Sequence, residues 1–220
     1  MHEVRIGEDL RDRNREIAGE NRKILGARGI TTFNVMSAPG AGKTSLLVRT
    51  IPLLRERVSI GVIEGDIQTR IDAERIAALG VPAYQIETGG VCHLDAAMVH
   101  SALHQIDLDS IDVLFIENVG NLVCPAEFDL GEDARVMLLS VSEGDDKPKK
   151  YPLMFRESRL LLLNKIDLLP HVRFDVAKAM REAREINPSL DVIEISCTTG
   201  EGLDRWVAWV ESHRRAEGRS

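Results

Sequence analysis

Cysteine and histidine stand side by side in the segment ETGGVCHLDA, where Cys92 is followed directly by His93. Another cysteine, Cys124, comes later in the segment NVGNLVCPAEFD. Thiolates and imidazole nitrogens are donors that Zn²⁺ and Ni²⁺ accept in proteins. The three side chains therefore suggest a metal site. The alternative is that the cysteines are simply small, buried apolar residues.

A metal site at these residues needs more ligands than one chain supplies. Both cysteine segments follow predicted strands, and in a parallel sheet the carboxyl ends of the strands share one edge. Cys92, His93 and Cys124 leave a four-coordinate ion incomplete, so we expect a two-fold dimer to bring two such sets together. A catalytic Cys–His pair is a weaker hypothesis, because residues adjacent in sequence rarely face each other.

A phosphate-binding loop is predicted by the segment SAPGAGKT (37–44). It fits the pattern G-x-x-x-x-G-K-[ST] except that Ser37 replaces the first glycine. Glycines let backbone N–H groups curl around phosphate oxygens, the lysine reaches the β and γ phosphates, and the threonine hydroxyl ligates Mg²⁺. A glycine turn that merely caps a helix is the alternative. The predicted phosphate-binding residues are Gly40, Ala41, Gly42, Lys43, Thr44 and Ser45.

A guanine-binding loop is predicted by NKID, residues 164–167, at the end of another strand. The Asp167 carboxylate can accept hydrogen bonds from guanine N1–H and N2–H₂, a pair that adenine does not offer. Asn164 and Lys165 would brace the loop and cover the base. The backbone of Ser196 and Cys197, in SCTTG, would contact the guanine oxygen, and the Cys197 thiol is interpreted as structural. The expected nucleotide is GTP or GDP.

Mg²⁺ requires hard oxygen ligands besides Thr44. Strand-end carboxylates supply them, and we favour Asp66 and Glu117 over Glu64, with backbone contact to the γ-phosphate from Gly120. The expected catalytic group is therefore Lys43, Thr44, Asp66 and Glu117. No glutamine or arginine stands out as a residue that orients the attacking water. Slow intrinsic GTP hydrolysis, accelerated by a partner or by dimerisation, is expected.

Short apolar strands alternate with helices along the chain, which predicts a doubly wound, mostly parallel sheet in three α/β/α layers. A helical segment at 1–29 is expected to pack on a nucleotide-binding domain at 30–220, and 143–152 is expected to be a charged loop. His100 and His104 lie four apart on a predicted helix, where an exposed face is favoured over a metal site. The predicted strands are 30–37, 58–64, 82–87, 112–118, 134–141, 159–164 and 191–196.

Composition excludes several classes of protein. The 220 residues carry a net charge of -7, which argues against sequence-independent nucleic-acid binding. No apolar run approaches the ~20 residues needed to span a bilayer. Three cysteines do not suggest a disulfide framework, and the charged N-terminus does not resemble a signal peptide. A cytoplasmic location is therefore expected, with no membrane partner.

Taken together, the segments SAPGAGKTSLL, EGDIQTRIDAERI, ETGGVCHLDA, FIENVGNLVCPAEFDLGE and NKIDLL resemble the hydrogenase nickel-incorporation GTPases, the HypB family. The resemblance implies a P-loop NTPase with a SIMIBI-type G domain. It also implies a GTPase that dimerises when GTP is bound and delivers nickel to the [NiFe]-hydrogenase large-subunit precursor, with a HypA-like nickel metallochaperone as partner. It favours Ni²⁺ or Zn²⁺ at Cys92, His93 and Cys124.

The family often carries an N-terminal cysteine-rich or histidine-rich metal motif. Residues 1–30 contain only His2 and no cysteine, so the internal site is expected to bind the metal alone. We further hypothesise that nucleotide and metal affinity are coupled, because the segments around Asp66 and Glu117 are contiguous with the two cysteine loops.

Four other hypotheses remain open at this stage. A urease accessory GTPase is expected to carry Cys-Pro-His after its paired glycines, whereas here Cys92 is followed by His93. A chaperone GTPase for cobalamin-dependent mutases would not need the two cysteines. A kinase or ligase would need an acceptor-substrate segment, and none is evident. A regulatory GTP switch without metal would bind partners through its nucleotide state alone.

Overall fold

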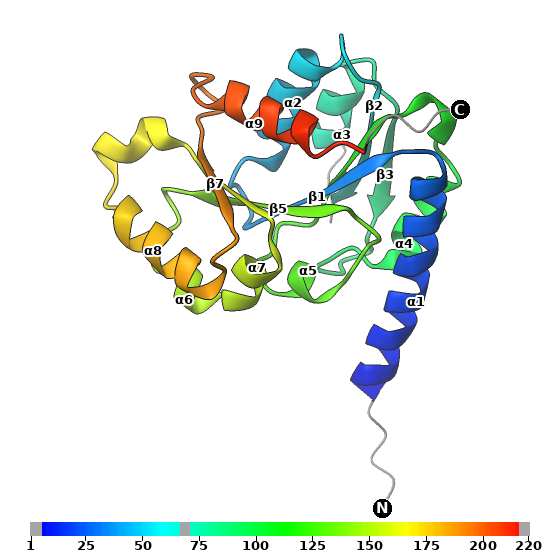
Figure 1. The fold of residues 1–220 in the computed structure, drawn as a ribbon, viewed down its shortest axis with the longest axis horizontal. Coiled ribbons are helices and arrows are strands. Elements are labelled where there is room, and N and C mark those ends of the chain that lie inside the picture. Colours follow the sequence, from blue (N-terminus) through cyan, green and yellow to red (C-terminus); the bar gives the residue numbers. More distant parts are fainter. Residues whose placement is uncertain (1–5, 67–70, 216–220) are drawn as a thin grey trace, which may run out of the picture.

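The computed structural model describes residues 6–66 and 71–215, which form one sheet with helices on both faces (Figure 1). The sheet has seven strands, all parallel, in the order β3-β2-β4-β1-β5-β6-β7. All seven predicted strands are present, and the predicted doubly wound parallel fold is confirmed. The strands are β1 Thr31–Ser37, β2 Ile60–Asp66, β3 Ala83–Glu87, β4 Val113–Glu117, β5 Ala134–Ser140, β6 Leu160–Asn164 and β7 Asp191–Glu194.

Continuous apolar runs form the central strands because helices cover both of their faces. Every residue of β1, β4 and β6 is buried, as expected of strands inside a covered parallel sheet. The chain places β2, β3 and β4 on one side of β1 and then β5, β6 and β7 on the other. The direction of winding therefore reverses at β1, and open α/β sheets bind ligands at the carboxyl edge beside such a point.

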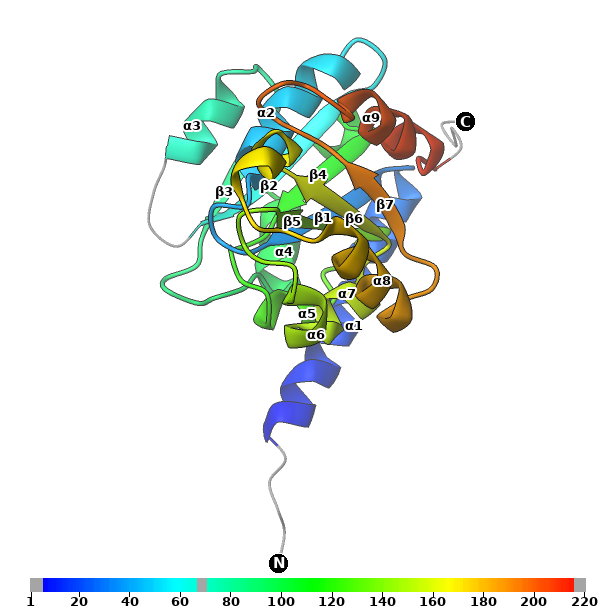
Figure 2. The same ribbon diagram turned by 90° about the vertical axis from the view of Figure 1, so that its left-hand side faces the viewer.

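The helices form two layers, which are separated by the sheet in Figure 2. One layer contains α2, α3 and α9, whose apolar side chains share a core with Phe33, Phe115 and Trp206. The other layer contains α1 and α4 at one end and α5 to α8 at the other. The helices are α1 Ile6–Ala27, α2 Lys43–Leu54, α3 Ile71–Ala77, α4 Ala96–Leu103, α5 Cys124–Glu127, α6 Lys147–Lys150, α7 Pro152–Glu157, α8 Val176–Ile186 and α9 Leu203–Ser212, with 3₁₀ turns at Leu108–Ser110 and Ile166–His171.

The N-terminal helix α1 packs along α4 and uses two buried asparagines to do so. Asn14 accepts a hydrogen bond from the Ala96 amide at 2.8 Å and donates to the Asp129 carbonyl at 2.7 Å. Asn21 donates to the carbonyls of Ala96 and Leu130. The start of α4 and the 129–130 loop are thereby attached to α1. The division of the chain at residue 29 into two units stays a prediction.

The predicted charged loop at 143–152 is wrong in part. Residues Lys147–Lys150 form α6, and α7 begins at Pro152. Pro148 is buried in the first turn of α6, where proline is well tolerated. Lys150 pairs with Asp146 at 2.6 Å, and Lys149 pairs with Glu182 of α8 at 3.0 Å. The segment thus contains helical turns that contact α8, whereas its composition alone had predicted a loop.

The part of the chain that the structure describes contains no helix with the length and apolar character needed to cross a membrane.

Candidate functional site

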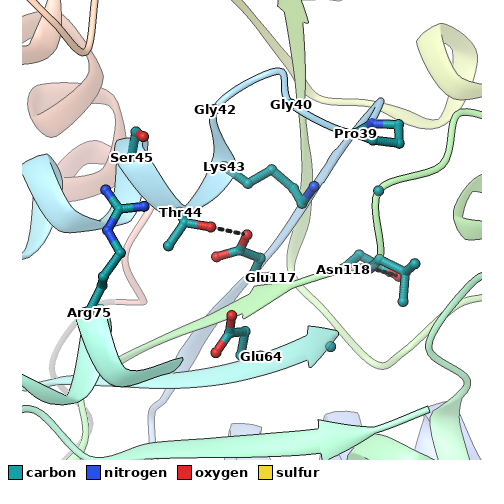
Figure 3. Close-up of a pocket in the computed structure, with 13 residues that line it drawn as sticks. Pro39, Gly40, Gly42, Lys43, Thr44, Ser45, Glu64, Arg75, Glu117 and Asn118 are labelled. Carbon is teal, nitrogen blue, oxygen red and sulfur yellow. Dashed lines mark hydrogen bonds between the residues drawn. The ribbon is translucent and has the colours of Figure 1, made fainter. Parts of the chain in front are cut away.

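A pocket of about 380 Å³ opens where the strands end at the carboxyl edge of the sheet (Figure 3). It is formed by the loop after β1, the start of α2 and the ends of β2 and β4. Its lining combines a lysine, a threonine and carboxylates with glycines, which suits a phosphate bearing a hard cation. The lining residues are Pro39, Gly40, Gly42, Lys43, Thr44, Ser45, Glu64, Gly65, Arg75, Glu117, Asn118, Val119 and Gly120.

The backbone of the loop between β1 and α2 requires glycine at two positions. Gly40 has φ 73° and Gly42 has φ 110°, in the left-handed region that favours glycine. A Cβ at Gly42 would also lie 2.6 Å from Asn164 Nδ2. Gly42 is the N-cap residue of α2, so the amide end of the helix faces the pocket. This geometry fits a phosphate group, as the SAPGAGKT segment predicted.

Ser37 occupies the first position of that motif without conformational conflict. It is the last residue of β1 and is fully buried, and its φ is not positive. Its hydroxyl accepts a hydrogen bond from Lys43 Nζ at 3.2 Å and donates to the Ala38 carbonyl at 2.7 Å. The turns that need glycine come later in the loop. Serine is therefore compatible with this position, and its hydroxyl contacts the motif lysine.

Hard oxygen donors meet at the floor of the pocket. The Thr44 hydroxyl donates to Glu117 Oε1 at 2.7 Å, and Glu64 pairs in register with Glu117 across β2 and β4. Glu64 and Glu117 are only 3% and 5% exposed. A hydroxyl and two carboxylates are suitable ligands for Mg²⁺. Glu64 therefore enters the candidate set from its position, whereas the Asp66 side chain lies outside the described residues, so its predicted role is not tested.

Arg75, from α3, lines the same pocket (Figure 3). The sequence analysis singled out no glutamine or arginine that would orient the attacking water, and that expectation stays untested, although Arg75 now stands at the wall of the pocket. Arg75 lies within the segment EGDIQTRIDAERI that carried the family resemblance, but nothing in its type or spacing assigned it to the pocket. It reaches the pocket because α3 packs against α2, the helix that follows the phosphate-binding loop, and against β3.

The NKID segment contacts the phosphate-binding loop directly. Asn164 Nδ2 donates to the Ala41 carbonyl at 2.8 Å, and Lys165 Nζ donates to the Gly40 carbonyl at 2.7 Å. Lys165 has φ 64°, the single positive value among non-glycine residues in 6–66 and 71–215. A lysine in this conformation is uncommon, and backbone strain of this kind is concentrated at functional sites. The predicted bracing role of Asn164 and Lys165 is consistent with these contacts.

Asp167 and the SCTTG segment lie together at the end of β6. The Ser196 hydroxyl donates to Asp167 Oδ1 at 2.5 Å, and the Cys197 amide donates to Asn164 Oδ1 at 3.3 Å. Burial raises the pKa of the Cys197 thiol to about 11. Cys197 is therefore a neutral thiol at physiological pH, in agreement with its interpretation as structural.

The two cysteine segments converge on one cluster. Cys92 Sγ lies 3.0 Å from Cys124 Sγ and 3.7 Å from His93 Nδ1. The ligand atoms of Cys92, His93 and Cys124 all lie within 4.8 Å of one another. Among the side chains that the structure describes, this is the one group of three or more Cys, His, Asp or Glu with that geometry. The predicted convergence is therefore present, and all three residues are half-buried.

The surroundings of the cluster favour a neutral imidazole. Burial lowers the pKa of His93, and the nearby charges of Asp95 and Glu127 offset this effect only partly. The ring of His93 stacks on Phe128, with the ring centres 4.0 Å apart. The hydrogen bond from Cys92 and partial burial raise the pKa of Cys124. A neutral imidazole can donate a lone pair to a metal, and metal binding here must displace thiol protons.

Asn118 connects the pocket and the cluster. It lines the pocket directly after Glu117 and is 1% exposed. Its Oδ1 accepts the amide of Leu94 at 3.1 Å, one residue beyond His93, and its Nδ2 donates to Asn34 Oδ1 at 3.2 Å. A buried side chain thus joins the wall of the pocket to the backbone of the metal-ligand segment.

Residues 31–194 match the family model described as CobW/HypB/UreG, nucleotide-binding domain. The hydrogenase maturation factor HypB of Escherichia coli (strain K12) is 53% identical over 216 residues, which are 98% of this chain and 74% of that protein. The chain belongs to the HypB family. The resemblance seen in the sequence motifs is therefore confirmed.

Two solved HypB structures share the fold over almost the whole chain. The HypB of Archaeoglobus fulgidus has a TM-score of 0.86 at 41% identity and covers 91% of this chain and 98% of its own. The HypB of Helicobacter pylori, solved in complex with nickel, has a TM-score of 0.88 at 34% identity and covers 94% of this chain and 99% of its own. The chain therefore has the P-loop α/β fold of these relatives.

Proposed function

We propose that this HypB chain is a GTP-hydrolysing nickel carrier that acts in hydrogenase maturation. The observation that carries the proposal is the convergence of Cys92, His93 and Cys124 beside a pocket built for nucleotide phosphates. A relative named hydrogenase maturation factor HypB and the HypB of Helicobacter pylori solved in complex with nickel support the choice of cargo.

GTP would occupy the pocket with its phosphates on the loop between β1 and α2. Lys43 and the amides around Gly42 hold the phosphate oxygens, and Asp167 accepts hydrogen bonds from guanine. Mg²⁺, held by Thr44 and Glu117 and by Asp66 or Glu64, would neutralise charge on the β and γ phosphates. The reaction is GTP plus water to GDP plus phosphate. Arg75 is the candidate among the lining residues to stabilise the charge that develops on the γ-phosphate.

Nickel would bind as cargo at the three-residue cluster. Two thiolates and a neutral imidazole suit Ni²⁺ and also Zn²⁺. One chain supplies three donors, so a homodimer formed in the GTP state would complete the site. The proposed partner that supplies nickel to this site is a HypA-like metallochaperone. The proposed partner that receives the nickel is a hydrogenase large-subunit precursor.

Nucleotide and metal would be coupled through Asn118. The γ-phosphate contacts the segment Glu117–Gly120 in this proposal, and Asn118 carries any shift to the Leu94 amide. Because coupling between binding sites is reciprocal, GTP would change nickel affinity by the factor by which nickel changes GTP affinity.

Equilibrium dialysis with Ni²⁺ and Zn²⁺, with sedimentation in parallel, tests the proposal. The protein is compared with GDP and with a non-hydrolysable GTP analogue. We expect a dimer with the analogue, and a metal affinity that differs between the two nucleotides. Cys124→Ala should lose the high-affinity metal, whereas Cys197→Ala, which removes the thiol outside the cluster, should keep it. Metal binding that is indifferent to nucleotide would instead identify a GTP switch with an incidental metal site.

A further inference from the structure

A pair of histidines on α4 lies outside the site described so far. His100 and His104 are one helical turn apart, and their Nε2 atoms lie 3.2 Å from each other. His100 is half-buried and His104, the C-cap residue of α4, is exposed. The sequence analysis favoured an unused helix face here. The distances in the structure instead allow a chelating pair.

The separation of the two nitrogens matches that of two ligands on one ion. Imidazole nitrogens bind Zn²⁺ at about 2.0–2.1 Å, and bond angles from about 90° to 109° then place the two nitrogens roughly 2.9–3.4 Å apart. The observed 3.2 Å falls in this range. The rings meet edge to face, with an interplanar angle of 76°, so a small rotation of the exposed His104 ring directs both lone pairs at one point.

The hydrogen bonds around Asn21 determine which ring nitrogen of His100 carries a proton. Asn21 Nδ2 donates to the carbonyls of Ala96 and Leu130, at 2.9 and 3.0 Å, which uses both of its N–H groups. Asn21 Oδ1, 2.8 Å from His100 Nδ1, must therefore accept, and His100 Nδ1 must carry the proton. In the neutral ring, His100 Nε2 then carries a lone pair and accepts the 3.2 Å hydrogen bond from His104 Nε2. When the His104 proton moves to its own Nδ1, both Nε2 atoms present lone pairs to a metal. A metal-bound histidine is usually held in this way, by a partner that accepts from its other ring nitrogen.

We propose that His100 and His104 form a second binding site for a borderline divalent cation, of the class of Ni²⁺, Cu²⁺ and Zn²⁺. The two imidazoles would supply two ligands, and water would complete the coordination. Because the site has imidazole ligands and no thiolate, we expect it to bind metal more weakly than the Cys92 cluster does. Its affinity should be higher for Cu²⁺ than for Ni²⁺ and Zn²⁺. Asn21 acts as a positioning residue, so α1 contributes to the site. The inference stands independently of the proposed nickel-carrier function.

The test uses the full chain without an affinity tag, in which Cys92→Ser, His93→Ala and Cys124→Ser together remove the first site. Calorimetric titration with Ni²⁺ alone should show one ion bound per chain. Adding His104→Ala, which keeps the helix because alanine favours helices, should weaken that binding by about 10-fold or more. Adding His171→Ala, which removes an exposed histidine elsewhere, should leave it unchanged.

Three results would overturn the inference. The first is Ni²⁺ binding that His104→Ala leaves unchanged. The second is the absence of Ni²⁺ binding from the parent triple variant while circular dichroism shows that variant folded.

The third comes from ¹⁵N-resolved imidazole spectra of the same protein. They should show His100 protonated at Nδ1 without metal, and the Nε2 signals of both histidines should shift on adding Ni²⁺. The opposite tautomer at His100 would contradict the argument from Asn21.

Discussion

Ser196 donates its hydroxyl proton to Asp167 Oδ1 at 2.5 Å, which joins the ends of β6 and β7 at the guanine loop. Ser196 is fully buried and its oxygen also accepts the amide of Thr199 at 3.1 Å. This fixes the orientation of the carboxylate, so the acceptor oxygens of Asp167 are positioned before a base arrives. Such preorganisation favours a base that presents two donors on one edge.

Asp167→Asn should weaken GTP binding by about 2–4 kcal/mol, roughly 30- to 1,000-fold, because an amide cannot accept both guanine donors. Xanthosine triphosphate presents a carbonyl where guanine has its amino group. Its affinity for Asp167→Asn, relative to that of GTP, should therefore be higher than in the wild type. Competition against a fluorescent nucleotide measures both affinities. Asp204→Asn, at an exposed carboxylate on α9, is the matched control. Equal GTP affinity in Asp167→Asn and the control would mean that Asp167 does not contact the base.

Gly42→Ala should reduce nucleotide affinity by at least about 10-fold, because alanine is strained at φ 110° and its Cβ would lie 2.6 Å from Asn164 Nδ2. The loop must shift, and its amides then no longer surround the phosphate. Gly19→Ala on α1 is the comparison, since an added Cβ there meets nothing within 4 Å. That variant should keep nucleotide affinity and gain about 0.5–1 kcal/mol of stability. Normal nucleotide binding by Gly42→Ala would contradict the assigned phosphate site.

Asn118→Ala should lower the free energy of unfolding by about 1–3 kcal/mol, since the buried amide of Leu94 would lose its acceptor. Urea unfolding measures this loss. The variant should also show a smaller difference in Ni²⁺ affinity between GDP and the GTP analogue. Asn121→Ala is the matched control, because the Asn121 side chain accepts the amide of Val123 within its own loop. A nucleotide effect that survives intact in Asn118→Ala would mean that coupling follows another route.

Asp129→Asn should remove a pH-dependent contribution to the docking of α1. Burial alone would raise the pKa of Asp129, but the Gly131 amide and Arg22, 2.9 Å away, together bring it below its ordinary value. A lowered carboxylate pKa stabilises the fold above the unfolded-state pKa, and this contribution is lost as pH falls through the folded value. At pH 7 the variant should be less stable by roughly 0.5–1 kcal/mol, since the ion pair is partly exposed.

Urea unfolding of wild type and Asp129→Asn across the acidic range checks this sign. The difference between the two proteins should shrink as pH falls below the ordinary aspartate range. Asp109→Asn, at a carboxylate 85% exposed beside Arg28, should show a smaller difference at every pH. A difference for Asp129→Asn that stays constant with pH would mean that the loss comes from packing and not from charge.

Much of the fold could be predicted from local sequence. The LLLLN and TTFNVMS runs, bounded by turns and helices, predicted buried parallel strands, because covering both faces of a sheet demands continuous apolar sequence. The phosphate and guanine loops were also predictable, since each is contiguous and its chemistry depends on neighbouring residues. Residues 147–150 were missed because α6 packs against α8, with Pro148 buried, and this contact lies outside any local window.

The sequence by itself thus determined the strands and the contiguous loops, in which residue type and spacing fix the chemistry. Tertiary structure alone decided what came together between segments: Cys92 with Cys124, Glu64 and Arg75 in the phosphate pocket, and the Asn21 contact that sets the proton of His100. Local propensities act over a few residues. The order of the strands and the packing of α1 on α4 determine which distant segments meet, because only the folded chain brings their side chains within bonding distance.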